Sequence, residues 1–196
     1  MDVPIGLKIA IIGDGQVGKT CLRESFTGIA FEASPIMIKT LGADFSKKTI
    51  MIDSKQVELQ IWDLAGQPGW IMVREAFYAG IMGAIVVFDY SRNETIASIP
   101  HWVRELWTHN NIGHVPLVIT GNKSDLKARA LEKGTGIPDA AVQKMLAELR
   151  SGSEGIPIDF FDTSAKNGYN VDKAFYKLGK NTLEFVMKLQ QAIDEE

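Results

Sequence analysis

The chain has 196 residues, of which 45% are hydrophobic and 23% are charged, the balance of an ordinary globular domain. Its 21 Lys and Arg residues are outnumbered by 24 Asp and Glu residues, and the formal net charge of −3 argues against nucleic acid as the main partner. The single cysteine, Cys21, excludes an internal disulfide and fits a reducing compartment.

The sequence shows no recognisable export or membrane signal. Residues 1–6 lack a charged region followed by an apolar core, and the longest apolar run, residues 79–88, is about half of the ~20 residues that a membrane-spanning helix needs. The C-terminal QQAIDEE contains no cysteine to prenylate, so no lipid anchor is expected on this chain. We expect a monomeric cytoplasmic protein that meets membranes, if at all, through partners.

Strand and helix patterns alternate from the N-terminus. Residues 7–12 form a nearly continuous apolar run that ends at Gly13, which is typical of a buried parallel strand. Residues 18–27 predict a helix, and residues 28–42, which lack a clean period, predict a long loop. Strands are then predicted at residues 43–52 and 56–63, joined by a connection so short that it favours an antiparallel hairpin.

The second half of the chain continues the alternation. Residues 83–90 and 115–122 predict two short buried strands, with a helix between them that Pro100 would weaken unless it lies in the first turn. A helix over 139–150, a strand over 158–164 and a last helix with an apolar stripe from Val171 to Leu189 complete the pattern.

This order predicts a single α/β domain over residues 1–196. Its sheet has six strands, mostly parallel with one antiparallel edge strand, and helices cover both faces. Ligands of such sheets bind at the carboxyl ends of the strands, so the residues that follow each strand are the candidates for chemistry.

Residues 13–20, GDGQVGKT, fit the pattern G-x-x-x-x-G-K-[ST] between a predicted strand and a predicted helix. Glycines let this phosphate loop curl so that backbone N–H groups of residues 15–20 point inward, above a helix N-terminus. Lys19 would reach the terminal phosphates of a nucleotide, and the Thr20 hydroxyl would bind Mg²⁺. The alternative, a glycine turn with a solvated lysine, is disfavoured by the strand–helix context.

A second candidate segment, Asp63 to Gln67, follows the strand VELQIW. Asp63 suits a role beside Mg²⁺, Gly66 would let a backbone N–H approach a γ-phosphate, and Gln67 could orient an attacking water. By itself this segment also fits an ordinary Asp-led turn.

Two further segments suit a guanine base. In Asn122-Lys123-Ser124-Asp125, the Asp125 carboxylate can accept two N–H bonds that guanine offers and adenine does not. Asn122 can bond the guanine edge, and the alkyl stem of Lys123 can cover the base plane. In TSAK, residues 163–166, a backbone N–H could reach the guanine carbonyl; both segments alone also fit polar turns.

Together GDGQVGKT, the threonine of KTLGADF, WDLAGQ, GNKSD and TSAK resemble a small GTPase of the Ras superfamily, with a Rab-like flavour from TLGADF, LQIWD and the pair Phe77-Tyr78. The resemblance covers residues 7–191. It implies a P-loop NTPase G domain that binds GTP or GDP with Mg²⁺.

The resemblance also assigns individual roles. Gln67, Lys19 and Thr40 would be catalytic, with Thr40 as the switch threonine, and Thr20, Thr40 and Asp63 would hold Mg²⁺. The residues implied to bind the nucleotide are Gly15, Gln16, Val17, Gly18, Lys19, Thr20, Cys21, Phe31, Thr40, Gly66, Asn122, Lys123, Asp125, Ser164, Ala165 and Lys166.

Four features depart from the Rab-like pattern. The loop from Phe31 to Thr40 is slightly long, and Pro68-Gly69 follows Gln67 where charged residues are usual. Residues 127–155 form a longer segment than usual. The missing C-terminal cysteine means either a truncated sequence or a protein that works without the lipid anchor.

The resemblance and the residues together predict a GTP/GDP switch with slow intrinsic hydrolysis, in membrane traffic or signalling. Effectors, an exchange factor and a GTPase-activating protein are the implied partners, since Arg74 in the predicted second-switch helix has nothing to place it on the phosphate. A GTP-binding scaffold with negligible turnover is the alternative that Pro68-Gly69 keeps open, and a P-loop kinase or ATPase is disfavoured by Asn122 and Asp125. Trp62, which alternates with Ile61, is expected to be exposed as part of a partner surface.

Overall fold

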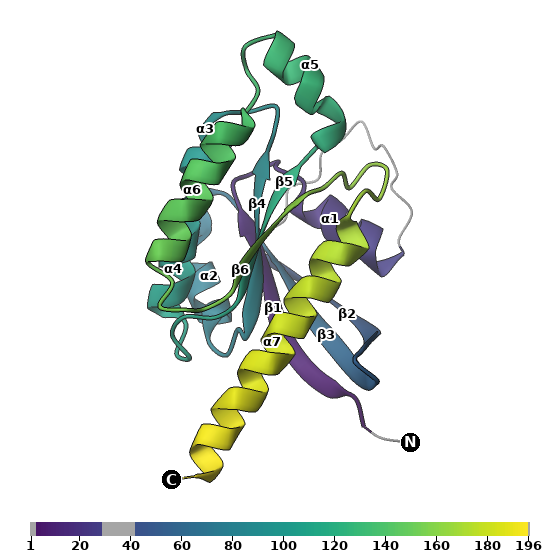
Figure 1. Cartoon of the computed structure of the whole chain (residues 1–196), viewed down its shortest axis with the longest axis vertical. Coiled ribbons are helices and arrows are strands. Elements are labelled where there is room, and N and C mark those ends of the chain that lie inside the picture. The colour runs from purple at the N-terminus through teal and green to yellow at the C-terminus, as the bar shows by residue number, and fades with distance from the viewer. Residues whose placement is uncertain (1–2, 29–41, 196) are drawn as a thin grey trace.

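The computed structural model describes residues 3–28 and 42–195. Within them one six-stranded sheet runs through the molecule in the order β2-β3-β1-β4-β5-β6 (Figure 1). The strands are β1 (Ile5–Gly13), β2 (Ala43–Ile52), β3 (Lys55–Leu64), β4 (Gly83–Asp89), β5 (Leu117–Asn122) and β6 (Ile158–Asp162). Every neighbouring pair is parallel except β2 with β3, so the predicted antiparallel edge strand is confirmed.

Helices lie on both faces of the sheet, as predicted (Figure 1). The helices are α1 (Lys19–Thr27), α2 (Ile71–Tyr78), α3 (Glu94–Ala97), α4 (Ile99–His109), α5 (Lys127–Glu132), α6 (Asp139–Ser151) and α7 (Val171–Asp194). Side chains of α2, α4 and α6 pack on one apolar cluster, and side chains of α1 and α7 pack on the other. None of the helices in the described ranges is both long and apolar enough to cross a bilayer.

The burial of each strand follows from its place in the sheet. All seven residues of the central strand β4 are buried, because helices cover both of its faces. In β3 buried and half-buried residues alternate, so Val57, Leu59 and Ile61 enter the core. Because helices cover both faces of the sheet, the edge at which the parallel strands have their carboxyl ends is the place left for a ligand site.

The structure adds two details to the predicted elements. The helix expected between β4 and β5 is divided at Ser98 into α3 and α4, and Pro100 lies in the first turn of α4, where a missing N–H costs nothing. Residues 127–132, the start of the unusually long segment 127–155, form α5, and Nζ of Lys127 donates to Oδ1 of Asp139.

Candidate functional site

The phosphate loop, residues 13–20, turns from β1 into α1 with a backbone that only glycine adopts readily. Gly13 has φ of 138° and Gly18 has φ of 98°. A Cβ on Gly13 would collide with the carbonyl of Val87, and a Cβ on Gly18 would collide with the amide of Asn122. The two glycines therefore set the loop against β4 and β5, and the sequence pattern has a steric reason at both ends.

Lys19 is buried at the start of α1, and its Nζ donates to the carbonyls of Gly13 and Asp14, each at 2.8 Å. Burial lowers the pKa of this amine to about 8, against the opposing attraction of Asp63 and Asp14. The Lys19 side chain thus reaches from the end of the loop back to its first two residues. Burial disfavours the positive charge of the Lys19 amine, and a negatively charged phosphate oxygen bound beside it would stabilise that charge.

Thr20 and Asp63 meet beside the lysine. The Thr20 hydroxyl donates to Oδ2 of Asp63 at 2.5 Å, and Oδ1 of the fully buried carboxylate has no hydrogen-bond partner among residues 3–28 and 42–195. Burial raises the pKa of Asp63, which the hydrogen bond from Thr20 and the charge of Lys19 oppose. An oxygen pair with one unsatisfied carboxylate atom is the donor chemistry that Mg²⁺ prefers, so these residues fit the metal.

The segment after β3 lies directly on the phosphate loop. A Cβ on Gly66 would stand 2.5 Å from Nζ of Lys19 and 2.6 Å from the Asp14 carbonyl carbon. Only a residue without a side chain can make this approach. Gln67 follows at the same edge, with Cγ 4.0 Å from the position of a Cβ on Gly15. Its Oε1 is buried and lacks a hydrogen-bond partner in the described part of the chain, so it is available to a polar group that enters the site.

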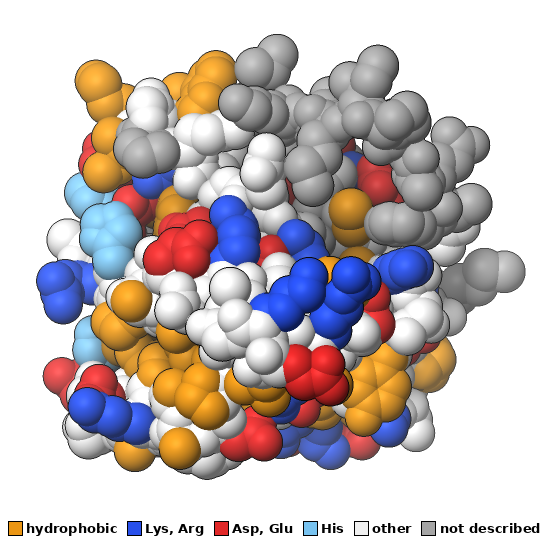
Figure 2. Space-filling model, turned by 90° about the horizontal axis from the view of Figure 1, so that it is seen from above, with side chains coloured by type: hydrophobic (Ala, Val, Ile, Leu, Met, Phe, Trp, Pro, Cys, Tyr) orange, Lys and Arg blue, Asp and Glu red, His pale blue; other side chains and the backbone are white. Residues whose placement is uncertain are grey.

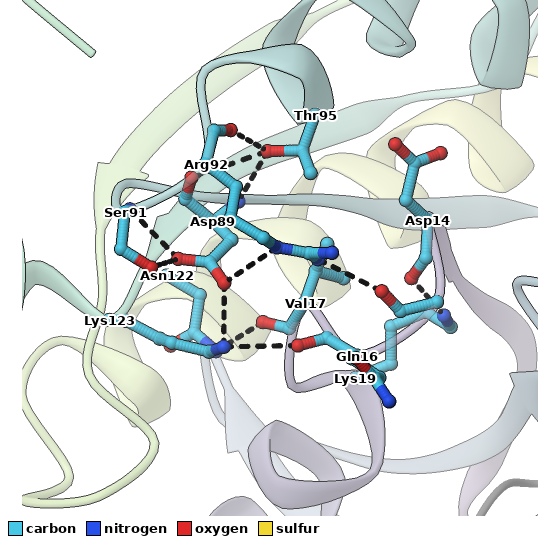
Figure 3. Close-up of polar contacts among 11 residues, drawn as sticks. Asp14, Gln16, Val17, Lys19, Asp89, Ser91, Arg92, Thr95, Asn122 and Lys123 are labelled. Atoms are coloured by element: carbon cyan, nitrogen blue, oxygen red, sulfur yellow. Dashed lines mark hydrogen bonds and ion pairs between the residues drawn. The ribbon is translucent and has the colours of Figure 1, made fainter. Parts of the chain in front are cut away.

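The third group of residues follows the ends of β5 and β6, and Figure 3 shows its members Asn122 and Lys123 beside the phosphate loop. Nδ2 of Asn122 donates to the Val17 carbonyl at 2.8 Å, while its Oδ1 accepts from the backbone N–H of Ala165 at 3.1 Å. The Ser164 hydroxyl donates to Oδ1 of Asp125 at 2.6 Å. Asn122 therefore joins the phosphate loop to both predicted base-binding segments.

The electrostatics of this end of the molecule suit a phosphorylated ligand. Figure 2 looks onto the carboxyl ends of the strands and shows Lys and Arg side chains gathered near the centre of the face. Nζ of Lys123 donates to the Gln16 carbonyl at 3.0 Å and to the buried carboxylate of Asp89 at 2.6 Å. Lys123 is thereby fixed with its stem across the edge of the site, and Lys166 is exposed nearby in sequence to Ser164 and Ala165.

The structure brings together the phosphate loop, Asp63, Gly66, Gln67, Asn122, Lys123, Asp125, Ser164 and Ala165, as expected from the strand ends. Phe31 and Thr40 lie outside the described residues. Cys21 is half-buried, and burial raises the pKa of its thiol, which suits a packing residue.

Sequence reasoning missed a buried network behind the second segment. Arg74 donates through Nε and Nη2 to the Glu105 carboxylate at 2.8 and 2.9 Å, and through Nη1 to the carbonyls of Ala65 and Gln67, both at 3.0 Å. Its guanidinium also lies 4.6 Å from the Trp102 ring, whose Nε1 donates to Asp14 at 2.7 Å. The only sequence signal for this network was an acidic residue, Glu105, within the predicted helix that became α4.

The prediction for Trp62 is correct only in part. The indole is half-buried between Phe45 and Phe77, with ring centroids 4.9 and 5.0 Å away. Phe45 is 42% exposed, so the three rings form an apolar strip that reaches the surface.

The sequence of this chain is similar to those of known proteins. A family model described as Ras family matches residues 8–184. The chain is 38% identical over 174 residues to Ras-related protein SEC4 of Saccharomyces cerevisiae, an alignment that spans 89% of this chain and 74% of the relative. It is 34% identical over 175 residues to Ras-related protein RAB1BV of Beta vulgaris, with 89% and 75% of the two chains covered.

Proposed function

This chain belongs to the Ras family, as a Rab-like small GTPase that binds and hydrolyses GTP, and from that premise we propose a GTP/GDP switch with slow intrinsic turnover, built as a single G domain over residues 1–196. The observation that carries the proposal is the contact of Gly66 with the mouth of the phosphate loop. A γ-phosphate bound beside Lys19 would meet the backbone of Gly66, so the segment after β3 would sense whether that phosphate is present.

In this proposal the phosphate loop and Lys19 hold the β- and γ-phosphates. Thr20, Asp63 and Thr40 hold Mg²⁺, which supplies positive charge against the phosphates when it is bound. The unsatisfied oxygen of Asp63 and the lowered pKa of Lys19 support these roles, because burial disfavours the charge on each group and the ligand would bring an opposite charge that stabilises it.

The base-binding residues select guanine. Asp125 accepts two N–H bonds from the base, and Asn122, Lys123, Ser164, Ala165 and Lys166 frame it, with Phe31 stacked nearby. The bond from Ser164 to Asp125 supports this role, since it fixes the carboxylate that must face the two guanine N–H groups.

Hydrolysis is proposed to be slow because positioning and electrostatics must act without an added cation. Gln67 orients the water, while Lys19 and the metal offset charge on the phosphates. Arg74 is engaged by Glu105 and two backbone carbonyls, so within the described residues it is held behind the segment that carries Gln67. An activating protein would supply the missing cation.

Loss of the γ-phosphate would release Thr40 and Gly66, and effectors would read the change at the switch segments. The strip of Phe45, Trp62 and Phe77 is the proposed effector contact, because it combines an exposed ring with two packed ones. The Rab-like resemblance supports a role in membrane traffic, a cytoplasmic location, and recruitment to membranes through partners.

Single-turnover hydrolysis of GTP tests the proposal. Wild type should convert bound GTP to GDP slowly and with a requirement for Mg²⁺, and Gln67→Leu should slow it further while GDP affinity is retained. Bound GTP that never turns over would instead identify a GTP-dependent scaffold, the outcome that Pro68-Gly69 would explain. Competition of GDP against ADP is the second arm, and equal affinity for both would contradict guanine selection.

A further inference from the structure

Three consecutive carbonyls of the phosphate loop are each held by a donor from outside the loop (Figure 3). Nη2 of Arg92 donates to the Gly15 carbonyl at 2.9 Å, Nζ of Lys123 to the Gln16 carbonyl at 3.0 Å, and Nδ2 of Asn122 to the Val17 carbonyl at 2.8 Å. Two of these donors belong to the base-binding segment. Arg92 does not; it lies in the loop between β4 and α3, 77 residues from its acceptor.

The direction of these carbonyls fixes the direction of the neighbouring N–H groups. A trans peptide is planar, so the carbonyl of one residue and the N–H of the next point opposite ways. With the Gly15 carbonyl turned toward Arg92, the N–H of Gln16 must face away from it, toward the inside of the loop. Arg92 therefore orients the first peptide of the row, just as Lys123 and Asn122 orient the second and third.

Arg92 is itself held in place by Asp89. Nε of Arg92 donates to Oδ2 of Asp89 at 3.2 Å, and the same oxygen accepts from Lys123. The Asp89 carboxylate is fully buried, and its other oxygen accepts from the backbone N–H and hydroxyl of Ser91. One buried anion thus positions two cations whose remaining donors both reach the phosphate loop.

The chemistry of the site favours arginine here. The planar guanidinium can donate from Nε to Asp89 and from Nη2 to the Gly15 carbonyl at the same time, whereas a lysine amine is one point with rotatable donors. The Arg92 side chain is 33% exposed, so its contacts are partly shielded from water and yet can be reached from the surface.

From this geometry we infer that Arg92 is a positioning residue that keeps the phosphate loop in its phosphate-binding form and thereby slows the release of GDP. The inference rests on the proposed function, because it concerns the same nucleotide site. It adds a third clamp that comes from the loop after β4 and shares the Asp89 carboxylate with Lys123 of the base-binding segment.

The test is the dissociation rate of a fluorescent GDP analogue chased with excess GDP, for wild type, Arg92→Ala, Arg92→Lys and the surface control Arg104→Ala. A hydrogen bond from a charged group is commonly worth enough to change an equilibrium about tenfold, so Arg92→Ala should release GDP about ten times faster. Arg92→Lys should lie between wild type and Arg92→Ala, and Arg104→Ala, exposed on α4, should match wild type.

A second readout separates positioning from general loosening. Guanosine carries the base without phosphates, so a residue that acts through the phosphate loop should change competition by GDP and leave competition by guanosine unchanged. An unchanged GDP dissociation rate in Arg92→Ala, or an equal loss of affinity for GDP and guanosine, would overturn the inference. Failure of wild type to bind GDP at all would refute the proposed function instead, and the two failures are therefore distinguishable.

If Arg92→Ala does not fold, which thermal unfolding would reveal, Arg92→Lys carries the same comparison. It keeps the positive charge beside Asp89 but cannot bridge Asp89 and Gly15 with one rigid group. A wild-type release rate in a folded Arg92→Lys variant would then count against the inference.

Discussion

Substitution of Arg74 by alanine is expected to cost far more stability than loss of a surface ion pair. The guanidinium is 2% exposed and makes four hydrogen bonds, two to the Glu105 carboxylate and one each to the carbonyls of Ala65 and Gln67. Without it, Glu105 keeps the Tyr78 hydroxyl at 2.7 Å and His101 at 3.5 Å from its oxygens, too little to replace a full positive charge.

The size of the effect follows from that burial. Removing one partner of a buried pair commonly costs about 3–5 kcal/mol, because it leaves an uncompensated charge. For a domain of this size, that loss lowers the Tm by roughly 6–20 °C. Lys180→Ala is the matched control, since it breaks an ion pair of similar length, 2.8 Å to Asp53, whose partners are 35% and 60% exposed. Its Tm should stay close to that of wild type.

The assay is thermal and urea unfolding of GDP-saturated protein, followed by circular dichroism, for wild type, Arg74→Ala, Lys180→Ala and the double variant Arg74→Met/Glu105→Leu. The double variant should recover much of the stability, because it removes both charges and fills the space with apolar groups. A loss for Arg74→Ala no larger than that for Lys180→Ala would refute the reasoning.

Acid provides an independent check on the same pair. Burial would raise the pKa of Glu105, but the hydrogen bonds from Arg74 and Tyr78 outweigh it, and the pKa is lowered. A carboxyl group with a lowered pKa stabilises the fold above its unfolded pKa, about 4.3, and loses that contribution as the pH falls through the folded value. The stability difference between wild type and Arg74→Ala should therefore be largest at neutral pH and shrink in acid.

Three further predictions concern the site and its surface. Because the pKa of Lys19 is about 8, the affinity of the nucleotide-free protein for GDP should fall as the pH rises above that value and the amine loses its charge. Calorimetric titration with GDP at several pH values would measure this fall, with Lys19→Ala as the pH-insensitive reference. Gly66→Ala should abolish the preference for a GTP analogue over GDP, because its Cβ would stand 2.6 Å from the Asp14 carbonyl carbon; equal affinity ratios in variant and wild type would contradict this. Trp62→Ala should weaken capture of GTP-dependent partners, whereas unchanged capture would remove Trp62 from the partner surface.

The succession of strands along the chain, and the motifs that follow them, could be predicted from the sequence, because each depends on residues that are neighbours in the chain. A buried strand needs a run of apolar side chains, and a loop that wraps a phosphate needs its glycines, lysine and hydroxyl within a few residues of one another. The segments GDGQVGKT, DLAGQ and NKSD therefore indicate the candidate site from the sequence alone. The helix at residues 127–132 was not predicted, because a helix of six residues beside Gly and Lys residues is too short to show a clear hydrophobic period.

Contacts between distant residues were decided only by the tertiary structure. Arg74 and Glu105 are 31 residues apart, Arg92 and Gly15 are 77 apart, and Trp102 and Asp14 are 88 apart. Whether such groups meet depends on which helix faces pack on the sheet and at what height, and a local pattern of polar and apolar residues does not specify that. The sequence thus determined which residues are the candidates for binding and hydrolysing a guanine nucleotide, while the packing of α2, α4 and the loop after β4 determined what holds those residues in place.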